Sequence, residues 1–310
     1  MVGIINTSLG SLTSMCVTAL VTMAITLIFR TSFTTNFAQG VISAFGAYVA
    51  SFVITKWDLP VFVAIPLSML VSMGIAMLVD VVLFRRGRYV NALTKQIITM
   101  GLISIITGLT PVIFDVVGQK YEINPIIKDS FVFGKMLNNG GAEVEITVTY
   151  NALVCVAITA IVIPLIFILL RYSKWGLSVR ATASNEYVAG MMGINTHVVT
   201  AVSWGVAGAL GALAAYMRGT EFPSISTYYM TDYQVSAFLA GILGGFGTFH
   251  GPVICALLLP LVEGLVYAIF NAVGLEQYNG WSKAVVFAIA LVIIFVKPQG
   301  IFGKKIEKKV

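Results

Sequence analysis

The sequence predicts an all-α polytopic membrane protein that forms a single domain over residues 1–310 and crosses the bilayer about eight to nine times. Of its residues, 58% are hydrophobic and only 10% are charged. A soluble domain carries about a quarter charged residues, so the excess apolar surface must face lipid. Two of the apolar runs are interrupted by polar or glycine-rich stretches, and these predict two broken or re-entrant segments.

A membrane-spanning helix needs about 20 mostly apolar residues. Because two of the apolar runs in this chain are interrupted, we expect eight or nine full crossings. Nine crossings would put the two ends of the chain on opposite sides of the membrane. The runs are 9–29, 37–55, 61–84, 97–115, 149–170, 198–217, 233–248, 252–272 and 282–297.

Basic residues between the runs set the predicted orientation, because they gather in three clusters. The positive-inside rule places such clusters in the cytoplasm, and the third cluster takes the C-terminus with it. A nucleic-acid-binding surface is the other common source of basic clusters, and the flanking membrane spans argue against it. The clusters are Arg85, Arg86, Arg88 and Lys95; Arg171, Lys174 and Arg180; and Lys297, Lys304, Lys305, Lys308 and Lys309.

The polar loop 116–148 is predicted to lie on the extracytoplasmic side. Within it, Val144, Ile146 and Val148 alternate with polar residues, and the pair Asn139-Gly140 precedes them. An Asn-Gly turn followed by such alternation predicts a small β-hairpin. Two roles remain open for the hairpin: contact with an external protein, or simple shielding of the loop.

The polar segment 171–197 is predicted to be cytoplasmic and to contain a short helix. Ser184 or Asn185 can cap its start, and Glu186 places an acid in its first turn. Gly193 can end it. Helical spacing gives this helix a small apolar face that suits a groove on another protein. The face consists of Val188, Met191 and Met192. The alternative is an ordinary polar loop with some helical content.

The first interruption, 30–40, joins the first two spans and holds Asn36 and Gln39. It is too polar to face lipid, so its backbone must be covered by protein or line a cavity. Together with a second interruption in the other half of the chain, it points to a translocation path.

The second interruption, 241–252, holds five glycines and one proline, which weaken a continuous helix. Close helix packing is an equally open explanation of these glycines, because two pairs have GxxxG spacing. The pairs are Gly241/Gly245 and Gly247/Gly251.

Glu263 lies near the middle of the run 252–272. A charged side chain there costs about 2.5–3.5 kcal/mol on insertion scales, so it is a functional candidate by default. It can pair with a cation, be protonated or face a hydrated cavity, and we favour a structural pair or a helix-contact role. Arg30 and Asp80 lie near span ends, and we expect them to reach the interface by snorkelling.

The chain shows no sign of being an enzyme. No G-x-x-x-x-G-K-[ST] phosphate loop occurs, so any ATP hydrolysis would belong to a partner. Two histidines and three cysteines scattered through apolar runs give no metal site, and we expect no cofactor.

Four ordered motifs give the chain a family resemblance over nearly its whole length. It resembles the permease subunits of ABC importers for branched-chain amino acids, of the LivH type. Gln39 stands where that family usually has histidine, which speaks against a proton-linked role there. The motifs are Asn36-Phe37-Ala38-Gln39-Gly40 with Gly46-Ala47-Tyr48-Val49; the segment from Gly176 to Asn195; Leu243-Gly244-Gly245-Phe246-Gly247-Thr248 leading to Glu263; and Pro298-Gln299-Gly300-Ile301-Phe302-Gly303.

The resemblance implies a role for two sets of residues. The cytoplasmic segment would couple the chain to the ATPase, through Gly176, Arg180, Ala181, Asn185, Glu186, Ala189, Gly193 and Ile194. The interrupted segments would line the translocation path, with Asn36, Phe37, Gln39, Gly40, Tyr48, Gly244, Gly245 and Gly247 as candidates.

The resemblance also implies the chain's surroundings: a bacterial or archaeal cytoplasmic membrane and a small-molecule substrate such as leucine, isoleucine or valine. The expected partners are a second homologous, LivM-like permease, two ABC ATPase subunits, an extracytoplasmic solute-binding protein and membrane lipid, with no nucleic acid. Three alternatives remain: an ion-coupled secondary transporter centred on Glu263, a passive channel, and a permease for urea or amides.

Overall fold

The structure is a computed structural model that describes residues 9–85, 91–115, 121–123, 125, 127, 129–137, 143–222 and 224–303. The Asn139-Gly140 turn, Arg86, Arg88 and the lysines at 304–309 lie outside the described residues.

Eight helical segments among the described residues are long and apolar enough to cross a membrane, which confirms the predicted all-α polytopic fold. They are α2 (Leu12–Ser32), α3 (Gln39–Trp57), α4 (Val61–Val79) continued by the π-helical η1 (Asp80–Phe84), α5 (Ala92–Phe114), α6 (Tyr150–Tyr172), α9 (Thr196–Glu221), α11 (His250–Val273), and α12 (Ser282–Val296) preceded by the 3₁₀ turn η2 (Glu276–Trp281).

The ninth predicted span, 233–248, is the shorter helix α10 (Thr231–Gly244) of 14 residues. A helix of that length rises about 21 Å, which is less than the roughly 30 Å of the hydrocarbon core. It ends because Gly245 adopts φ 81°, a left-handed conformation that favours glycine. The second interruption is therefore a real break in the helix.

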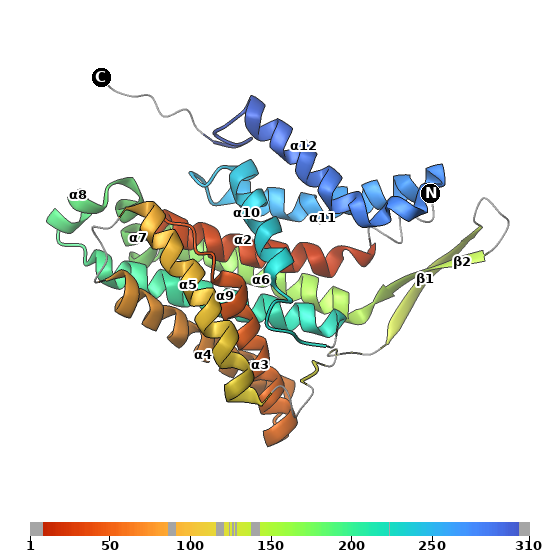
Figure 1. The fold of residues 1–310 in the computed structure, drawn as a ribbon, viewed down its shortest axis with the longest axis horizontal. Helices are drawn as coiled ribbons and strands as arrows, with labels where there is room; N and C mark the ends of the chain where they lie inside the picture. Colours follow the sequence, from red (N-terminus) through yellow and green to blue (C-terminus); the bar gives the residue numbers. More distant parts are fainter. Residues whose placement is uncertain are drawn as a thin grey trace.

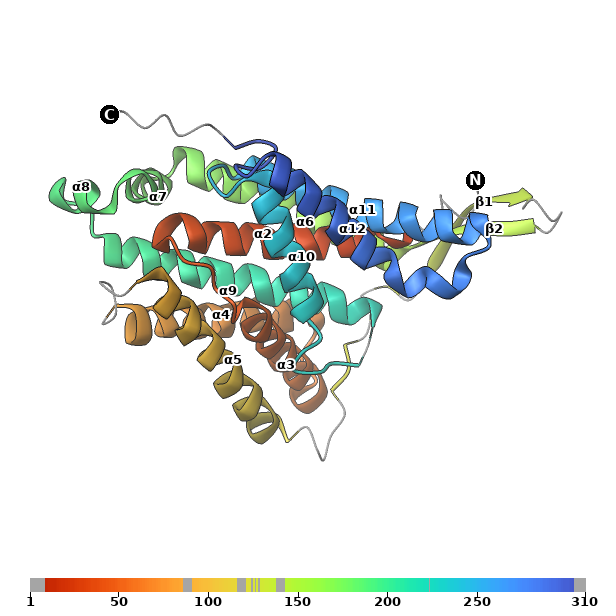
Figure 2. The same cartoon turned by 45° about the horizontal axis from the view of Figure 1, so that its top comes forward.

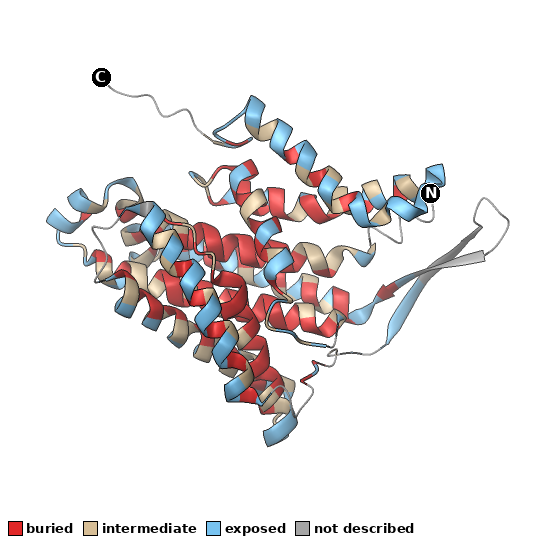
Figure 3. Ribbon diagram, viewed as in Figure 1, coloured by how far each residue is buried: buried red, intermediate tan, exposed pale blue. Residues whose placement is uncertain are grey.

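Three helices, α2, α9 and α3, form the centre of the bundle, and α4, α5, α6 and α12 surround them (Figure 3). In α2, 78% of an 18-residue apolar stretch is buried inside the protein. The corresponding share is 17% in the segment that ends in α12. Small residues on α9 allow this close packing: a Cβ added at Gly208 would lie 2.5 Å from the Ser72 carbonyl oxygen of α4. The outer helices expose large apolar residues, such as Phe62 and Phe295, as lipid contact requires.

Two features mark opposite ends of the molecule (Figures 1 and 2). At one end is the predicted hairpin, with strand β1 (Ser130–Leu137) antiparallel to β2 (Glu143–Thr149). At the other end are two short helices, α7 (Lys174–Ser184) and α8 (Glu186–Met191). We call these the hairpin end and the α7–α8 end.

Candidate functional site

Helix α7 is joined to the end of α6 by several hydrogen bonds. Ser173 caps α7, and its Oγ accepts a hydrogen bond from the Gly176 N–H at 2.9 Å. A Cβ at Gly176 would collide with the carbonyl oxygen of Leu170, so the corner requires glycine. Arg180 donates from Nη1 to the Leu170 carbonyl and, at 3.2 Å, to that of Arg171. A guanidinium on the open carbonyls of a helix C-terminus is favourable, so α6 and α7 should move as one body.

Helix α8 has both of its ends closed by local hydrogen bonds. The Asn185 side chain caps it by accepting from the Val188 N–H at 3.1 Å. At the other end, Gly193 has φ 86° and donates to Gly190 O, while Ile194 donates to Ala189 O, each at 3.1 Å. This is a Schellman motif. The predicted cap at 185 and stop at 193 are both present, whereas Ser184 belongs to α7.

The outer face of α8 is apolar and uncovered in the isolated chain. Its side chains are exposed by 77% at Tyr187, 65% at Met191 and 79% at Met192, while Ala189 is buried against the protein. A groove of about 580 Å³ runs beside it, between α8, Phe33 and the start of α9. Exposed apolar residues gathered on a short projecting element indicate an interaction surface. Tyr187 belongs to this face although the spacing argument omitted it.

Charged residues connect the underside of α8 to the transmembrane helices. Glu186 and His197 line a small cavity together with Asp80, Arg85 and Lys95. Asp80 is only 6% exposed and accepts a long hydrogen bond of 3.4 Å from Thr200 Oγ1 on α9. Asp80 is therefore buried against α9 in this structure, contrary to the expectation that it reaches the interface by snorkelling.

The segment between α2 and α3 is covered by protein. Gln39 is 0% exposed, and its Nε2 donates to the Ala207 carbonyl of α9 at 3.0 Å. Asn36 is 1% exposed, and its Oδ1 accepts from the Ala38 N–H at 2.9 Å. This satisfies the requirement that irregular backbone at membrane depth be shielded.

A residue that the sequence did not single out, Gln234 of α10, holds this segment in place. Its Nε2 donates to the Phe37 carbonyl at 2.6 Å, and its Oε1 accepts from the Gly40 N–H. The Phe37 N–H donates to Thr99 Oγ1 of α5 at 3.2 Å. We call Asn36, Phe37, Gln39 and Gly40 with Gln234 the latch.

The second interruption interlocks with the closing motif. Ile301 donates to the Leu243 carbonyl at 2.6 Å, and a Cβ at Gly300 would lie 2.6 Å from the Gly245 nitrogen. A Cβ at Gly244 would collide with the backbone of Gly251. Backbone contacts this close explain why so many glycines occur here. Gly247 differs, since a Cβ there would meet nothing within 4 Å.

The two interruptions meet at the end of α2. Arg30 donates from Nη1 to the Gly247 carbonyl, and its guanidinium lies 4.7 Å from the centroid of the Phe249 ring. Phe29 stacks on Phe246 with 4.5 Å between ring centroids. Arg30 therefore joins the two segments, and its reach to the membrane interface stays a prediction.

Tyr48 lies apart from the other predicted path residues, in an aromatic cluster with Phe114 and Tyr121. It is 1% exposed, donates from its hydroxyl to the Ile225 carbonyl at 3.1 Å, and stacks on Phe114 at 5.6 Å. Burial, and secondarily the Asp115 carboxylate, raise the pKa of Tyr121, so that phenol stays neutral.

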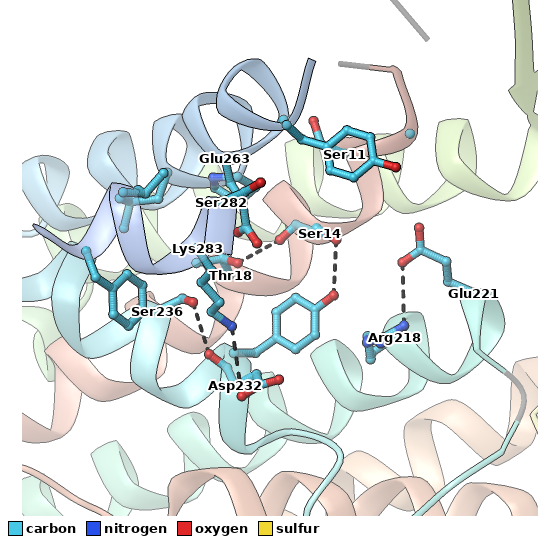
Figure 4. Close-up of a pocket in the computed structure, with 18 of the residues that line it drawn as sticks. Ser11, Ser14, Thr18, Arg218, Glu221, Asp232, Ser236, Glu263, Ser282 and Lys283 are labelled. Atoms are coloured by element: carbon cyan, nitrogen blue, oxygen red, sulfur yellow. Dashed lines mark hydrogen bonds and ion pairs between the residues drawn. The ribbon is translucent and has the colours of Figure 1, made fainter. Parts of the chain in front are cut away.

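A cavity of about 550 Å³ opens at the hairpin end between α2, α9, α10, α11 and α12. Lys283 Nζ lies 3.9 Å from Asp232 Oδ1, and Arg218 Nη1 lies 3.8 Å from Glu221 Oε2 (Figure 4). Glu263 of α11 also lines this space, and among the described residues it forms neither a hydrogen bond nor an ion pair. The carboxylate faces a polar cavity in which the charges of Lys283 and Asp232 act on it, and the structural role that we favoured stays a prediction. We call this space the mixed-charge cavity.

Known proteins resemble this chain over most of its length. A family model described as "Branched-chain amino acid transport system / permease component" matches residues 7–295. The permease protein BraD of Pseudomonas aeruginosa and LivH of Escherichia coli K12, both described as high-affinity branched-chain amino acid transport system permeases, are each 25% identical and cover 94% of this chain and 93% of their own length. The ribose import permease RbsC of Escherichia coli K12 is 23% identical and covers 93% of this chain and 85% of its own.

One solved structure shares the fold. It is titled "PsaBC from Streptococcus pneumoniae in complex with Fab" and superposes with a TM-score of 0.52 over 93% of this chain and 91% of that one. At 11% identity, this likeness supports the polytopic helical architecture alone.

Proposed function

This chain belongs to the family of branched-chain amino acid permease components, and from that premise we propose that it is the transmembrane subunit of an ABC importer for leucine, isoleucine and valine. The family predicted from the four motifs is confirmed by the match over residues 7–295. Within the part of the chain that the structure describes, eight helices are long and apolar enough to cross a membrane, which supports a multi-pass membrane protein. The importer mechanism and the substrate are the parts that we propose.

The observation that carries the proposal is the exposed apolar face of α8. A groove on a separate ATPase subunit would receive Tyr187, Met191 and Met192. Closure of the ATPases would then push on α8, and the rigid corner at Gly176 and Arg180 would pass the motion to α6. The remaining predicted coupling residues, Ala181, Asn185, Glu186, Ala189, Gly193 and Ile194, would shape and seat that helix.

Charge supports the proposed orientation, with the α7–α8 end and the C-terminus in the cytoplasm. The described basic residues at that end include Arg85, Lys95, Arg171, Lys174, Arg180 and Lys297. The positive-inside rule places them on the cytoplasmic side. The hairpin end would then meet an extracytoplasmic solute-binding protein, and a second, related permease would cover part of the exposed apolar surface of the outer helices.

The interrupted segments remain the proposed moving parts of the translocation path. Asn36, Phe37, Gln39 and Gly40 are held by hydrogen bonds in this state, and Arg30 ties them to Gly244, Gly245 and Gly247. A shift of α10 would release Gln234 from Phe37 and Gly40 and open this region. Tyr48, in its separate aromatic cluster, would act at the outer mouth.

A second candidate function is ion-coupled secondary transport. It is favoured by Glu263, a carboxylate inside the helical bundle that has no ion pair within 4 Å among the described residues. Uptake of radiolabelled leucine, isoleucine, valine and urea into proteoliposomes separates the two. With partner permease, ATPase and binding protein present, the importer requires ATP and prefers the three amino acids. Uptake driven by an ion gradient without ATPase subunits would overturn the importer proposal. Uptake of urea but of none of the three amino acids would overturn the proposed substrate.

A further inference from the structure

Carboxylates outnumber cations by one among the residues that line the mixed-charge cavity, and one of the carboxylates, Asp232, is exposed to solvent. The lining includes three carboxylates, Glu221, Asp232 and Glu263, but only two cations, Arg218 and Lys283. Each cation already lies within 4 Å of one of the first two carboxylates. Glu263 has no ion pair within 4 Å among the described residues, although the charge of Lys283 acts on it favourably, and a carboxylate so placed among helices favours a cationic ligand.

The hydroxyl groups of the cavity point to a ligand that donates hydrogen bonds. Thr18 donates to the Ser14 carbonyl at 2.7 Å, Ser282 to that of Asn279 at 2.7 Å, and Ser236 to that of Asp232 at 3.0 Å. Because their protons are engaged with the backbone, these oxygens can only accept from a ligand. A wall of acceptors beside a carboxylate suits an ammonium group, which has three donors and no acceptor.

Arg218, which lines the same cavity, carries hydrogen-bond donors that have no acceptor among the described residues. These donors, Nε and Nη1, are buried. The Arg218–Glu221 separation of 3.8 Å is well beyond the roughly 2.7–2.9 Å of a charge-assisted hydrogen bond. The guanidinium packs instead against Phe222, 3.6 Å from the ring centroid. Its hydrogen-bonding capacity is available to an anionic group after a small side-chain shift.

An apolar groove between α11 and α12 adjoins the cavity. Leu259 and Val286 line both spaces, and the groove of about 140 Å³ extends along Leu258, Val262 and Ile289. A ligand with a charged head in the cavity could therefore lay an aliphatic side chain against Leu259 and Val286. Charge of both signs beside an apolar slot matches a zwitterion with a branched aliphatic tail.

We infer that the mixed-charge cavity binds the head group of an aliphatic amino acid, with the ammonium against Glu263 and the acceptor hydroxyls and the carboxylate on the Arg218 side. The inference rests on the proposed function and adds a substrate site within this one subunit, distinct from the latch. An inorganic monovalent cation and the ammonium of a phospholipid head group share part of this chemistry, so the test includes both.

The test places a reporter thiol in the cavity by the substitution Ser11→Cys. The three native cysteines, Cys16, Cys155 and Cys255, are buried, and the unsubstituted chain gives the background. Labelling by cationic 2-aminoethyl and anionic 2-sulfonatoethyl methanethiosulfonate is measured in nanodiscs and normalised to a free thiol in solution. We expect the cationic reagent to be favoured about tenfold, because the charged residues that line the cavity sum to one negative charge.

Ligand protection identifies the occupant. L-leucine and 3-methylbutylamine should slow the cationic labelling, and 4-methylpentanoate, which lacks the ammonium, should not. Glu263→Gln should remove the cationic preference and the protection by the amine, whereas Glu276→Gln, an exposed acid of η2 outside the cavity lining, should keep both. If Glu263→Gln does not fold, Lys283→Gln is used instead and should strengthen the cationic preference.

Several results would overturn the inference. They are equal labelling by the two reagents, an unchanged preference in Glu263→Gln, protection by sodium chloride equal to that by leucine, and protection that appears only in phosphatidylethanolamine nanodiscs. Each of these, obtained with a complex that still imports leucine with ATP, refutes the cavity site and leaves the importer standing. Protection by leucine in a complex that never imports leucine refutes the importer instead.

Discussion

The latch and the mixed-charge cavity are both polar regions inside an apolar helical bundle, but their hydrogen bonding differs. In the latch, Gln39 and Gln234 reach backbone partners on other elements, and Asn36 closes a local turn. In the cavity, Glu263 and two nitrogens of Arg218 have no such partner among the described residues. A satisfied polar group holds a fold together, whereas an unsatisfied one is available to a ligand. The comparison distinguishes polar side chains that stabilise the fold from polar side chains that can bind a ligand.

The largest expected effect is the loss of the latch residue that makes two hydrogen bonds. Gln234→Leu leaves the Phe37 carbonyl and the Gly40 N–H buried without partners. Each unsatisfied buried group costs about 1–3 kcal/mol, so we expect a loss of about 2–6 kcal/mol in the free energy of unfolding. The measurement is denaturant unfolding in mixed micelles, with Gln96→Leu, which removes one partly buried bond to Thr35, as the matched control. A Gln234→Leu protein as stable as the control would show that the latch is not structural.

A smaller effect is expected at the third contact of the latch. Thr99→Val keeps the shape of the side chain but removes the acceptor for the Phe37 N–H. One unsatisfied buried donor should cost about 1–3 kcal/mol. The same unfolding assay reads it out, and Thr110→Val on the same helix, whose hydroxyl only bonds back to Ile106, is the control. Equal losses in the two variants would contradict the role given to Thr99.

The smallest expected effect on stability is at Glu263. Glu263→Gln breaks no hydrogen bond or ion pair among the described residues and removes a charge from the bundle. We therefore expect its unfolding free energy to be unchanged or higher than that of the unsubstituted chain. A loss comparable to that of Gln234→Leu would mean that Glu263 is part of a structural network, and the distinction between the two regions would fail.

The features that the sequence predicted correctly are local ones. The cap at Asn185 and the stop at Gly193 depend on residues within one helical turn, and the hairpin depends on alternation along two adjacent strands. The family followed from motifs that are contiguous in the chain. In each case the determining neighbours are close in sequence, so the pattern could be read directly.

The features that the sequence did not predict depend on distant neighbours. Gln234 contacts a residue 194 positions away, and the mixed-charge cavity requires side chains from five helices. Arg30 and Asp80 were expected to snorkel because their positions near span ends suggested it. The end of α2 meets the glycine-rich turn, and Asp80 is buried against α9. No pattern along the chain specifies which helices pack side by side.

The central claim is that an ATPase partner acts on this chain through the apolar face of α8, and one measurement tests it most directly. ATP-dependent leucine uptake and ATPase co-purification are compared between Met191→Glu and the matched variant Met191→Leu. Because Met191 is 65% exposed in the isolated chain, neither should unfold the protein. We expect Met191→Glu to lose uptake at least about tenfold and to release the ATPase, since burying an unpaired charge in the interface opposes docking, while Met191→Leu keeps both. Full uptake and ATPase retention by Met191→Glu would contradict the account.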